Sequence, residues 1–507
     1  MKQLFRNITL VAVALMLTTT ACDDGFAELN TNPNAAIEIN PNFQFSWIQL
    51  RTSGERYENW RAVLIYSSTM MQHLATTCGY WSGDKYFYNA GYSSSLFDRQ
   101  YTQAVKDIQD LIATLESGTA GDQTMLGMAR IWRTVIFHRL TDIYGDIPYS
   151  EAGKGFIEGI DFPVFDTQEF IYKDMLKELE EGIAQISDDP NQPGFGSADF
   201  LFSGDKGKWR RFGYSMMLRL GMRMSEVDPA EAQKWVEKAI QGGTLQAGED
   251  AFIEHTNGPE GINRNGIGEV LDLTNGSAGE GCPRLSATFV NWMKDHNDPR
   301  LDIIGTLPVN GTEHNGMPNG LDTETLLDNP TGTSADDFST VNQAIVKVSS
   351  PMMFLTVAES ELLLAEAAVR GWHSGSAQQH YENGIRAAMK NWERFDASIV
   401  VEDAVIDQYL ADNPFDEANA MQQIGEQYWA ATFLNEYETF SNWRRTGYPE
   451  LTPVDYPNNV TGGTIPVRLV LPQGELGVNP NMQDALNRQS LGTNFPDHFS
   501  VPVWWDK

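Results

Sequence analysis

Apolar residues recur every three or four positions along most of this chain, and this period constrains the fold more than any other feature. In the stretch 98–116 they form a single stripe that runs from Tyr101 to Leu115. Such a stripe is typical of a helix with one buried face. The same spacing predicts further helices over residues 123–144, 168–186, 208–224, 229–240 and 417–443. The body of the protein is therefore expected to be mainly α-helical.

Two adjacent stretches, 353–372 and 377–392, predict a closely packed pair of antiparallel helices. Small residues such as Ala365 and Gly384 recur there at helical spacing, and small side chains let two helices approach each other closely. The arrangement resembles the tetratricopeptide unit, a helix–turn–helix repeat of about 34 residues. We therefore predict a superhelical scaffold of tetratricopeptide-like helix pairs.

Two long regions, near 247–346 and 448–507, lack the helical period. They are rich in turn-forming sequences such as Asn257-Gly258-Pro259 and Pro318-Asn319-Gly320. A loop region of about a hundred residues inside a compact protein is unusual and often functional. No linker separates these regions from the helices, so we predict a single domain over 41–507 with loop-rich insertions and, at most, short strands around 467–471.

The charge of the chain excludes some partners. It has 68 acidic and 36 basic residues and a formal net charge of −32. Nucleic acid is excluded as a partner because phosphate binding needs clustered Lys and Arg. The same charge argues against the body resting on an anionic lipid surface through its own side chains.

The N-terminus predicts export and lipid anchoring. Lys2 and Arg6 precede a short apolar run over 8–17, and small residues lead up to Cys22. We expect residues 1–21 to be a lipoprotein signal peptide, the Cys22 thiol to carry lipid, and residues 22–40 to form a polar tether. The alternative is an ordinary secretory peptide. Thr19 departs from the usual lipoprotein pattern, which has Leu at that position.

Motifs for catalysis, metals and cofactors are missing. The eight histidines form no H-E-x-x-H or other close pair, since His373 and His380 fall in different predicted elements and His138 lies on an apolar helix as a core residue would. No nucleophile or phosphate-loop motif occurs. We therefore expect no enzyme, no cofactor and no metal. A carboxylate pair of the glycosidase type stays open, because 68 acidic residues allow many such pairs in space.

The three cysteines are too few for a disulfide framework, and none has zinc-site spacing. Cys78 and Cys282 would be able to bond in an oxidising compartment if they lie close together. The sequence does not show this, and we favour the unbonded state.

A segment at 78–92 carries six aromatic residues among Gly and Ser without helical period. Its rings either plug the core beneath the loop or form a platform for a ligand, because Tyr and Trp combine a flat apolar face with a polar tip. Sugars and peptides are both able to use such a surface. The candidate ligand residues in the segment are Tyr80, Trp81, Asp84, Tyr86, Tyr88 and Tyr92. The loop-rich region adds the candidates Asn263, Asn265, Arg284 and Trp292.

The segment Leu140-Thr141-Asp142-Ile143-Tyr144-Gly145-Asp146-Ile147-Pro148-Tyr149 resembles the hallmark of the SusD/RagB family of surface nutrient-binding lipoproteins. Asn442-Trp443-Arg444-Arg445-Thr446-Gly447-Tyr448-Pro449 is similar to a second family segment. Further agreement in order and spacing covers residues 202–223, 298–301, 358–367, 465–469 and 503–507. We expect these motif residues to be structural, with Asp142 and Asp146 bonding to backbone at a helix end and Arg444 and Arg445 pairing with acidic helices.

The resemblance implies about four tetratricopeptide-type helix pairs and a lipid-anchored protein on the outer membrane that faces the medium. It implies a TonB-dependent, SusC-like transporter as partner and an oligosaccharide, sometimes a peptide, as ligand, without catalysis. On this basis the protein captures glycan breakdown products and delivers them to the transporter. The alternatives are peptide binding, a surface glycan hydrolase, and a scaffold that binds only proteins.

Overall fold

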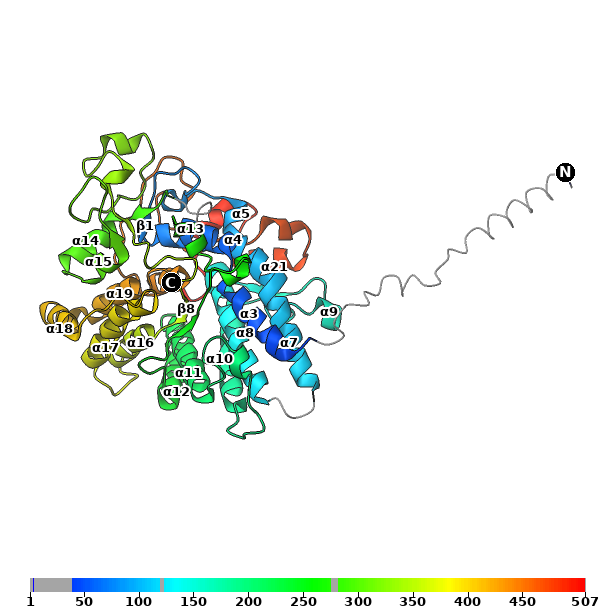
Figure 1. Cartoon of the computed structure of the whole chain (residues 1–507). Coiled ribbons are helices and arrows are strands. Elements are labelled where there is room, and N and C mark those ends of the chain that lie inside the picture. The colour runs from blue at the N-terminus through cyan, green and yellow to red at the C-terminus, as the bar shows by residue number, and fades with distance from the viewer. Residues whose placement is uncertain (1–2, 4–38, 119–122, 275–280, 507) are drawn as a thin grey trace. The chain divides into compact units, whose positions relative to one another are not determined.

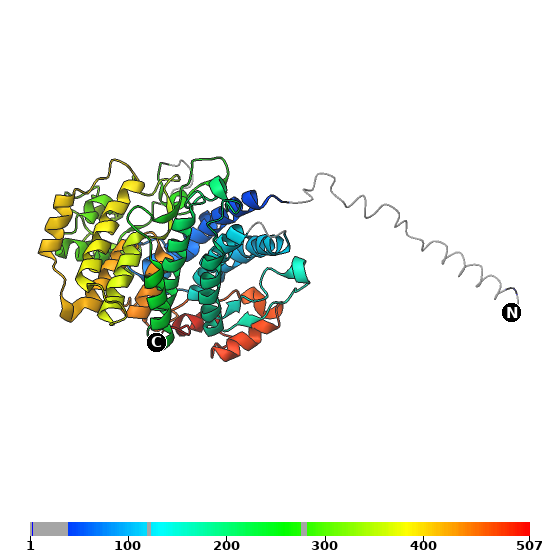
Figure 2. The same cartoon turned by 90° about the horizontal axis from the view of Figure 1, so that it is seen from below.

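The helix pairs of the computed structural model are those that the period predicts. The structure describes residues 3, 39–118, 123–274 and 281–506. In it, α8 packs against α10, α10 against α11, α11 against α12, and α16 against α17 (Figures 1 and 2). Their bounds are Gln123–Tyr144 (α8), Gln168–Gln185 (α10), Lys206–Arg223 (α11), Pro229–Gly242 (α12), Val357–Val369 (α16) and Ala377–Lys390 (α17). The mainly α-helical, tetratricopeptide-like scaffold is confirmed.

Local sequence explains where these helices begin and how closely they pack. Thr356 caps α16 in a capping box with Glu359, and Asp205 caps α11 by accepting from the backbone N–H of Lys208. At Gly384 an added Cβ would lie 2.7 Å from Leu362. The close approach of α16 and α17 therefore requires a residue without a side chain at this position.

The predicted helix over 417–443 is two helices, α19 (Ala420–Ala431) and α20 (Glu436–Thr446). The chain turns between them at Leu434, which has a φ of 72°. The prediction was wrong because apolar residues continue through the turn and hide it. The stretch 98–116 is also less regular than predicted, because a π-helical turn, η3 (Tyr101–Val105), separates α6 (Ser95–Gln100) from α7 (Lys106–Ser117).

The loop-rich region 247–346 is crossed by short elements that tie it to the scaffold. Strand β4 (Ala251–Ile253) pairs antiparallel with β8 (Met352–Leu355), and β5 (Arg284–Leu285) pairs with β1 (Leu74–Ala75). Two helices of this region, α14 (Ala287–Asp295) and α15 (Arg300–Ile304), contact each other. Residues 448–506 contain α21 (Asn481–Arg488), and no strand forms at 467–471.

The described residues from 41 onward form one compact unit. The predicted signal peptide, Cys22 and the tether up to residue 38 lie outside the described residues. Each helix in the described part of the chain is too short or too polar to cross a lipid bilayer.

The family motif residues pack inside the protein. Asp142 accepts hydrogen bonds from the Tyr172 hydroxyl and, at 3.2 Å, from Trp505 Nε1, so it bonds to side chains and not to a helix end. Asp146 does accept from a backbone N–H, that of Gln168 at 2.9 Å. Arg445 pairs with Glu366 on α16 at 2.6 Å, as expected. These residues hold the helices together and lie away from solvent.

Candidate functional site

The first rings of the candidate site are partly exposed and lie in the segment 57–60. Helix α4 (Arg56–Glu58) runs directly into the π-helical segment η1 (Asn59–Ser68). Residues 62–68 of η1 are all buried, whereas Tyr57, Trp60 and Arg61 are partly exposed. The buried part of η1 thus anchors the rings that precede it.

Two further rings from the predicted aromatic segment join Trp60. The Tyr80 ring stands edge-on to Trp60 with 6.0 Å between ring centroids, and the Tyr92 ring lies 6.3 Å from Trp60. Tyr80 is 43% exposed and Tyr92 is partly exposed. We call Tyr57, Trp60, Tyr80 and Tyr92 the aromatic platform.

Arginine side chains brace the aromatic platform. The Arg56 guanidinium lies 4.6 Å from the centre of the Trp60 ring. Arg61 lies 3.9 Å from Tyr57, 4.8 Å from Trp60 and 5.4 Å from Tyr92. Cations over aromatic faces are attracted to the ring quadrupole. The arginines therefore hold the rings in place and add hydrogen-bond donors at the edge of an otherwise apolar surface.

A disulfide bond fixes the loop that carries Tyr80. Cys78 and Cys282 are bonded, with 5.9 Å between their Cα atoms, so the favoured unbonded state was wrong. The pairing of β1 with β5 brings the two segments together just beyond the cysteines. The Tyr80 hydroxyl lies 3.4 Å from the Cys282 sulfur. The bond therefore positions one edge of the platform.

Replacing both cysteines by serine should lower the free energy of unfolding by about 2–4 kcal/mol, because the bond closes a loop across 204 residues. Denaturant unfolding measures the change. Dithiothreitol should shift the midpoint of the wild type and leave that of the double variant in place. An unchanged wild-type midpoint after complete reduction would contradict the prediction.

Three candidates of the aromatic segment are wrong as ligand residues because they are buried. Trp81 and Asp84 have no exposed surface and Tyr86 is 1% exposed. The cause is the turn η2 (Gly83–Lys85), which presses so closely on η1 that a Cβ at Gly83 would lie 1.9 Å from the Ile65 carbonyl oxygen. The turn therefore directs these side chains inward, and Asp84 bonds there to Lys85 at 3.0 Å.

The candidate residues of the loop-rich region also fall into two groups, buried and partly exposed. Asn265 and Arg284 are buried and bond to backbone carbonyls, for example Ser350 and Ala335, so they too are wrong. Trp292 is partly buried and donates through Nε1 to Glu426 on α19 at 3.1 Å. Asn263 is partly exposed. It is the last residue of the turn η5 (Gly261–Asn263). Farther along the chain, the backbone carbonyl of Glu269 accepts a hydrogen bond from Arg56 at 3.4 Å.

Tyr88 is partly exposed and packs edge-on against Phe499, 5.9 Å away between ring centroids. It stays a candidate beside the platform. The platform residues that sequence reasoning missed are Tyr57 and Trp60, with Arg56 and Arg61. An available signal was the spacing of Tyr57 and Trp60, three residues apart in a helix and flanked by arginines, just before a wholly buried stretch.

A buried carboxyl group lies between these two rings in the sequence. Glu58 is 2% exposed, and burial raises its pKa from 4.5 to about 7. The folded protein therefore holds a proton on Glu58 that the unfolded chain releases at lower pH. Stability is lost as the pH rises from 4.5 through about 7, because the folded state must then carry a buried charge.

Changing Glu58 to glutamine should remove this pH dependence. Relative to the variant, the wild type should lose up to about 3 kcal/mol of unfolding free energy as the pH rises from 4.5 to above 7. Unfolding curves of both proteins across this range test the difference. Parallel pH profiles would contradict the assigned direction.

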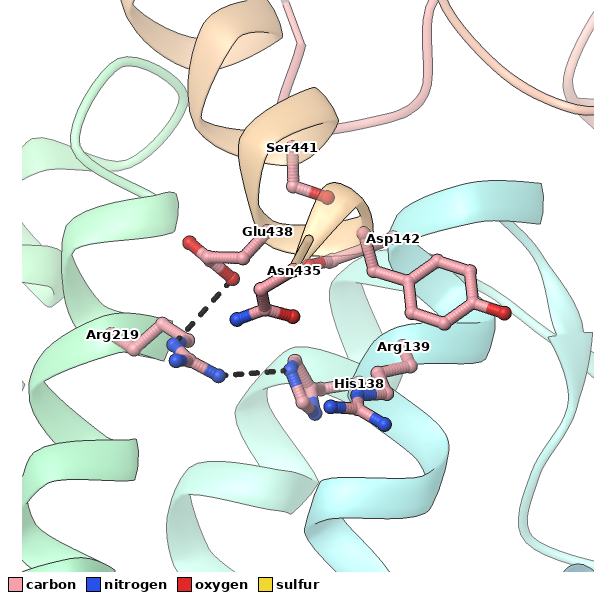
Figure 3. Close-up of a pocket in the computed structure, with 8 residues that line it drawn as sticks. His138, Arg139, Asp142, Arg219, Asn435, Glu438 and Ser441 are labelled. Atoms are coloured by element: carbon pink, nitrogen blue, oxygen red, sulfur yellow. Dashed lines mark hydrogen bonds and ion pairs between the residues drawn. The ribbon is translucent and has the colours of Figure 1, made fainter. Parts of the chain in front are cut away.

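The densest group of charged residues is not a site for ligands. Figure 3 shows Arg219 pointing toward Glu438 and His138, and Arg219 also pairs with Glu359. All four side chains are buried. Burial, together with Arg219, lowers the pKa of His138 well below its usual value, so the ring stays neutral. The prediction that His138 is a core residue is confirmed.

An open cavity of about 740 Å³ lies beside α17 and is the main alternative to the platform. Its lining contains no aromatic ring. Several of its charged groups are paired, for example Arg394 with Asp250 at 2.9 Å. The aromatic platform, with partly exposed rings and adjacent donors, is the surface better suited to a sugar. In the described part of the chain, no group of three or more His, Cys, Asp or Glu residues is placed to hold a metal ion.

Comparisons with known proteins agree with this architecture. A chitin-binding protein of known structure is 31% identical, has a TM-score of 0.82, and the match covers 92% of this chain and all of that one (100%). A SusD-like protein described as Bacteroidetes AC2a has 25% identity, a TM-score of 0.80 and coverage of 92% and 100%. A chitin-binding SusD homolog from Flavobacterium johnsoniae shares the fold at 23% identity and a TM-score of 0.76, with coverage of 92% and 98%. No curated protein sequence matches significantly.

A scaffold of helix pairs with long surface loops is thus the fold of SusD-like nutrient-binding proteins. The profile of the SusD-like family, described as starch-binding and associating with the outer membrane, matches residues 33–472. The chain belongs to this family, and the resemblance seen in its motifs is confirmed.

Proposed function

We propose that this protein binds oligosaccharides on the aromatic platform at the cell surface and delivers them to a TonB-dependent, SusC-like outer-membrane transporter. Lipid on Cys22 keeps the protein at the membrane. Because the transporter lies in the same membrane, anchoring raises the effective concentration of each partner for the other. The protein captures its ligand and releases it unchanged.

The observation that carries this proposal is the cluster of partly exposed rings around Trp60. Sugar rings have apolar C–H faces that stack on aromatic rings, while their hydroxyls need hydrogen-bond partners. Tyr80 and Tyr92 extend the aromatic surface around Trp60. The guanidinium groups of Arg56 and Arg61 lie 4.6 and 4.8 Å from the centre of the Trp60 ring. Braced rings lose little freedom on binding, which favours binding to a repeating sugar chain.

Chitin oligosaccharides are the first ligands to test, because the 31% identical relative is a chitin-binding protein. Maltooligosaccharides follow, because the family is described as starch-binding. Calorimetry with the purified mature protein should give saturable binding to at least one of these glycans. Binding to peptides alone would replace the glycan by a peptide ligand. Shortened sugars after incubation would instead establish a hydrolase.

Delivery to the transporter has its own test. Co-purification from membranes of cells that express both proteins should recover the transporter with wild-type protein. If glycan binding is intact and no transporter is recovered, the delivery step is wrong and the binding function stands.

A further inference from the structure

Two histidines that the sequence separates lie against each other at the turn between α16 and α17. His373 follows α16 and His380 lies in the first turn of α17. Their Nε2 atoms are 3.0 Å apart and their ring centroids 4.9 Å. Both rings are partly exposed, so solvent and small ions reach them.

A carboxylate orients one of the two rings. Glu361 on α16 lies 2.7 Å from His380 Nδ1, and Asn383 Nδ2 donates to the same carboxylate at 3.3 Å. A carboxylate at Nδ1 accepts a hydrogen bond from the ring N–H and so leaves the lone pair on Nε2, as in many carboxylate–histidine–metal arrangements. The lone pair of His380 Nε2 therefore faces the second imidazole.

The backbone is shaped to admit this pair. A Cβ at Gly375 would lie 2.4 Å from His373 Nε2 and 2.8 Å from His380 Nε2. Any side chain at position 375 would thus push the two nitrogens apart. The glycine lets the turn close against one side of the pair.

We propose that His373 and His380 bind one divalent transition-metal ion, such as Zn²⁺, Cu²⁺ or Ni²⁺, through their Nε2 atoms. Each Nε2 would lie about 2.0–2.1 Å from the ion, which places the two nitrogens roughly 3.0–3.4 Å apart. The observed 3.0 Å needs little movement of either ring. Glu361 supports His380 from behind, and water fills the remaining positions.

The chemistry of the pair suits these ions better than Ca²⁺ or Mg²⁺, which prefer oxygen ligands. Because two protein ligands hold the ion, we expect affinity in the micromolar range. A bound ion would join the end of α16 to the start of α17 and stabilise this helix pair.

The test is calorimetric titration of Zn²⁺ into mature protein that carries no histidine tag and has been treated with a chelator. One ion should bind per chain, and His373→Gln or His380→Gln should weaken binding by about 10-fold or more. His314→Gln is the matched control, because His314 pairs with Asp302 at 3.1 Å but has no second histidine. It should bind as the wild type does.

Gly375→Ala tests the geometry separately, because it keeps both imidazoles. It should weaken binding as the histidine variants do, and circular dichroism should verify that each variant is folded. With Cu²⁺, electron paramagnetic resonance should report two coordinating nitrogens in the wild type and fewer in either His variant. Equal binding by wild type and His373→Gln, or no saturable binding by the wild type, would overturn the proposal and leave a histidine pair that only shares a proton.

Discussion

Replacing Trp60 by alanine should weaken oligosaccharide binding by roughly 30-fold, which corresponds to about 2 kcal/mol. Trp60 is the ring that both Tyr80 and Tyr92 face, at 6.0 and 6.3 Å. Its loss removes the central stacking surface. It also removes the ring over which the Arg56 and Arg61 side chains lie. Calorimetry with the best-binding glycan measures the effect.

Trp47→Ala provides a matched control. Trp47 is 41% exposed and, like Trp60, has an arginine over its ring, with Arg51 at 4.2 Å. It lies on α3 (Pro41–Ser53), outside the platform, so its removal should leave glycan affinity unchanged. Tyr80→Phe keeps the ring and should bind far better than Tyr80→Ala. Full binding by Trp60→Ala would show that the ligand uses another surface.

Changing Arg223 to methionine should lower the free energy of unfolding by about 3–5 kcal/mol. Arg223 pairs with Glu438 at 2.7 Å and with Asp142 at 3.4 Å, and all three are buried. Burial alone would raise the pKa of Glu438, but Arg223 and Arg219 outweigh it and hold that pKa below its usual value. Without Arg223, carboxylates are left buried without their main cation.

Urea unfolding measures this loss, and an exposed ion pair supplies the control. Lys173 pairs with Glu169 at 2.5 Å on the surface of α10, where such pairs contribute less than about 1 kcal/mol. Lys173→Met should therefore change stability little. A loss of similar size in both variants would contradict the assigned role of burial.

The helices of the scaffold were predictable because each needs only a local pattern. A stripe at helical spacing and a cap such as Thr356 act over a few residues, and both are visible in the sequence. The turn at Leu434 was missed because the apolar pattern runs through it. Local signals thus identified the scaffold helices and missed two breaks, the turn at Leu434 and the π-helical turn η3.

The site was only partly predictable because burial depends on distant parts of the chain. Tyr80 and Trp81 are neighbours in one aromatic segment, yet one is exposed and the other buried. The Cys78–Cys282 bond and the His373–His380 contact depend on how β1 meets β5 and how α16 meets α17. The spacing of residues in the sequence does not show which distant elements will contact each other.

The π-helical winding of η1 has a consequence for how this surface tolerates a change in chain length. Each turn of a π-helix bonds residue i to i+5 and so contains one residue more than an α-helical turn. Deleting a single residue between Trp60 and the buried Tyr66 would allow ordinary α-helical bonding while Trp60 keeps roughly its present direction, because the wider turn accommodates the extra residue. A one-residue deletion here would therefore shorten the segment and leave the Trp60 ring on the same side of the buried anchor.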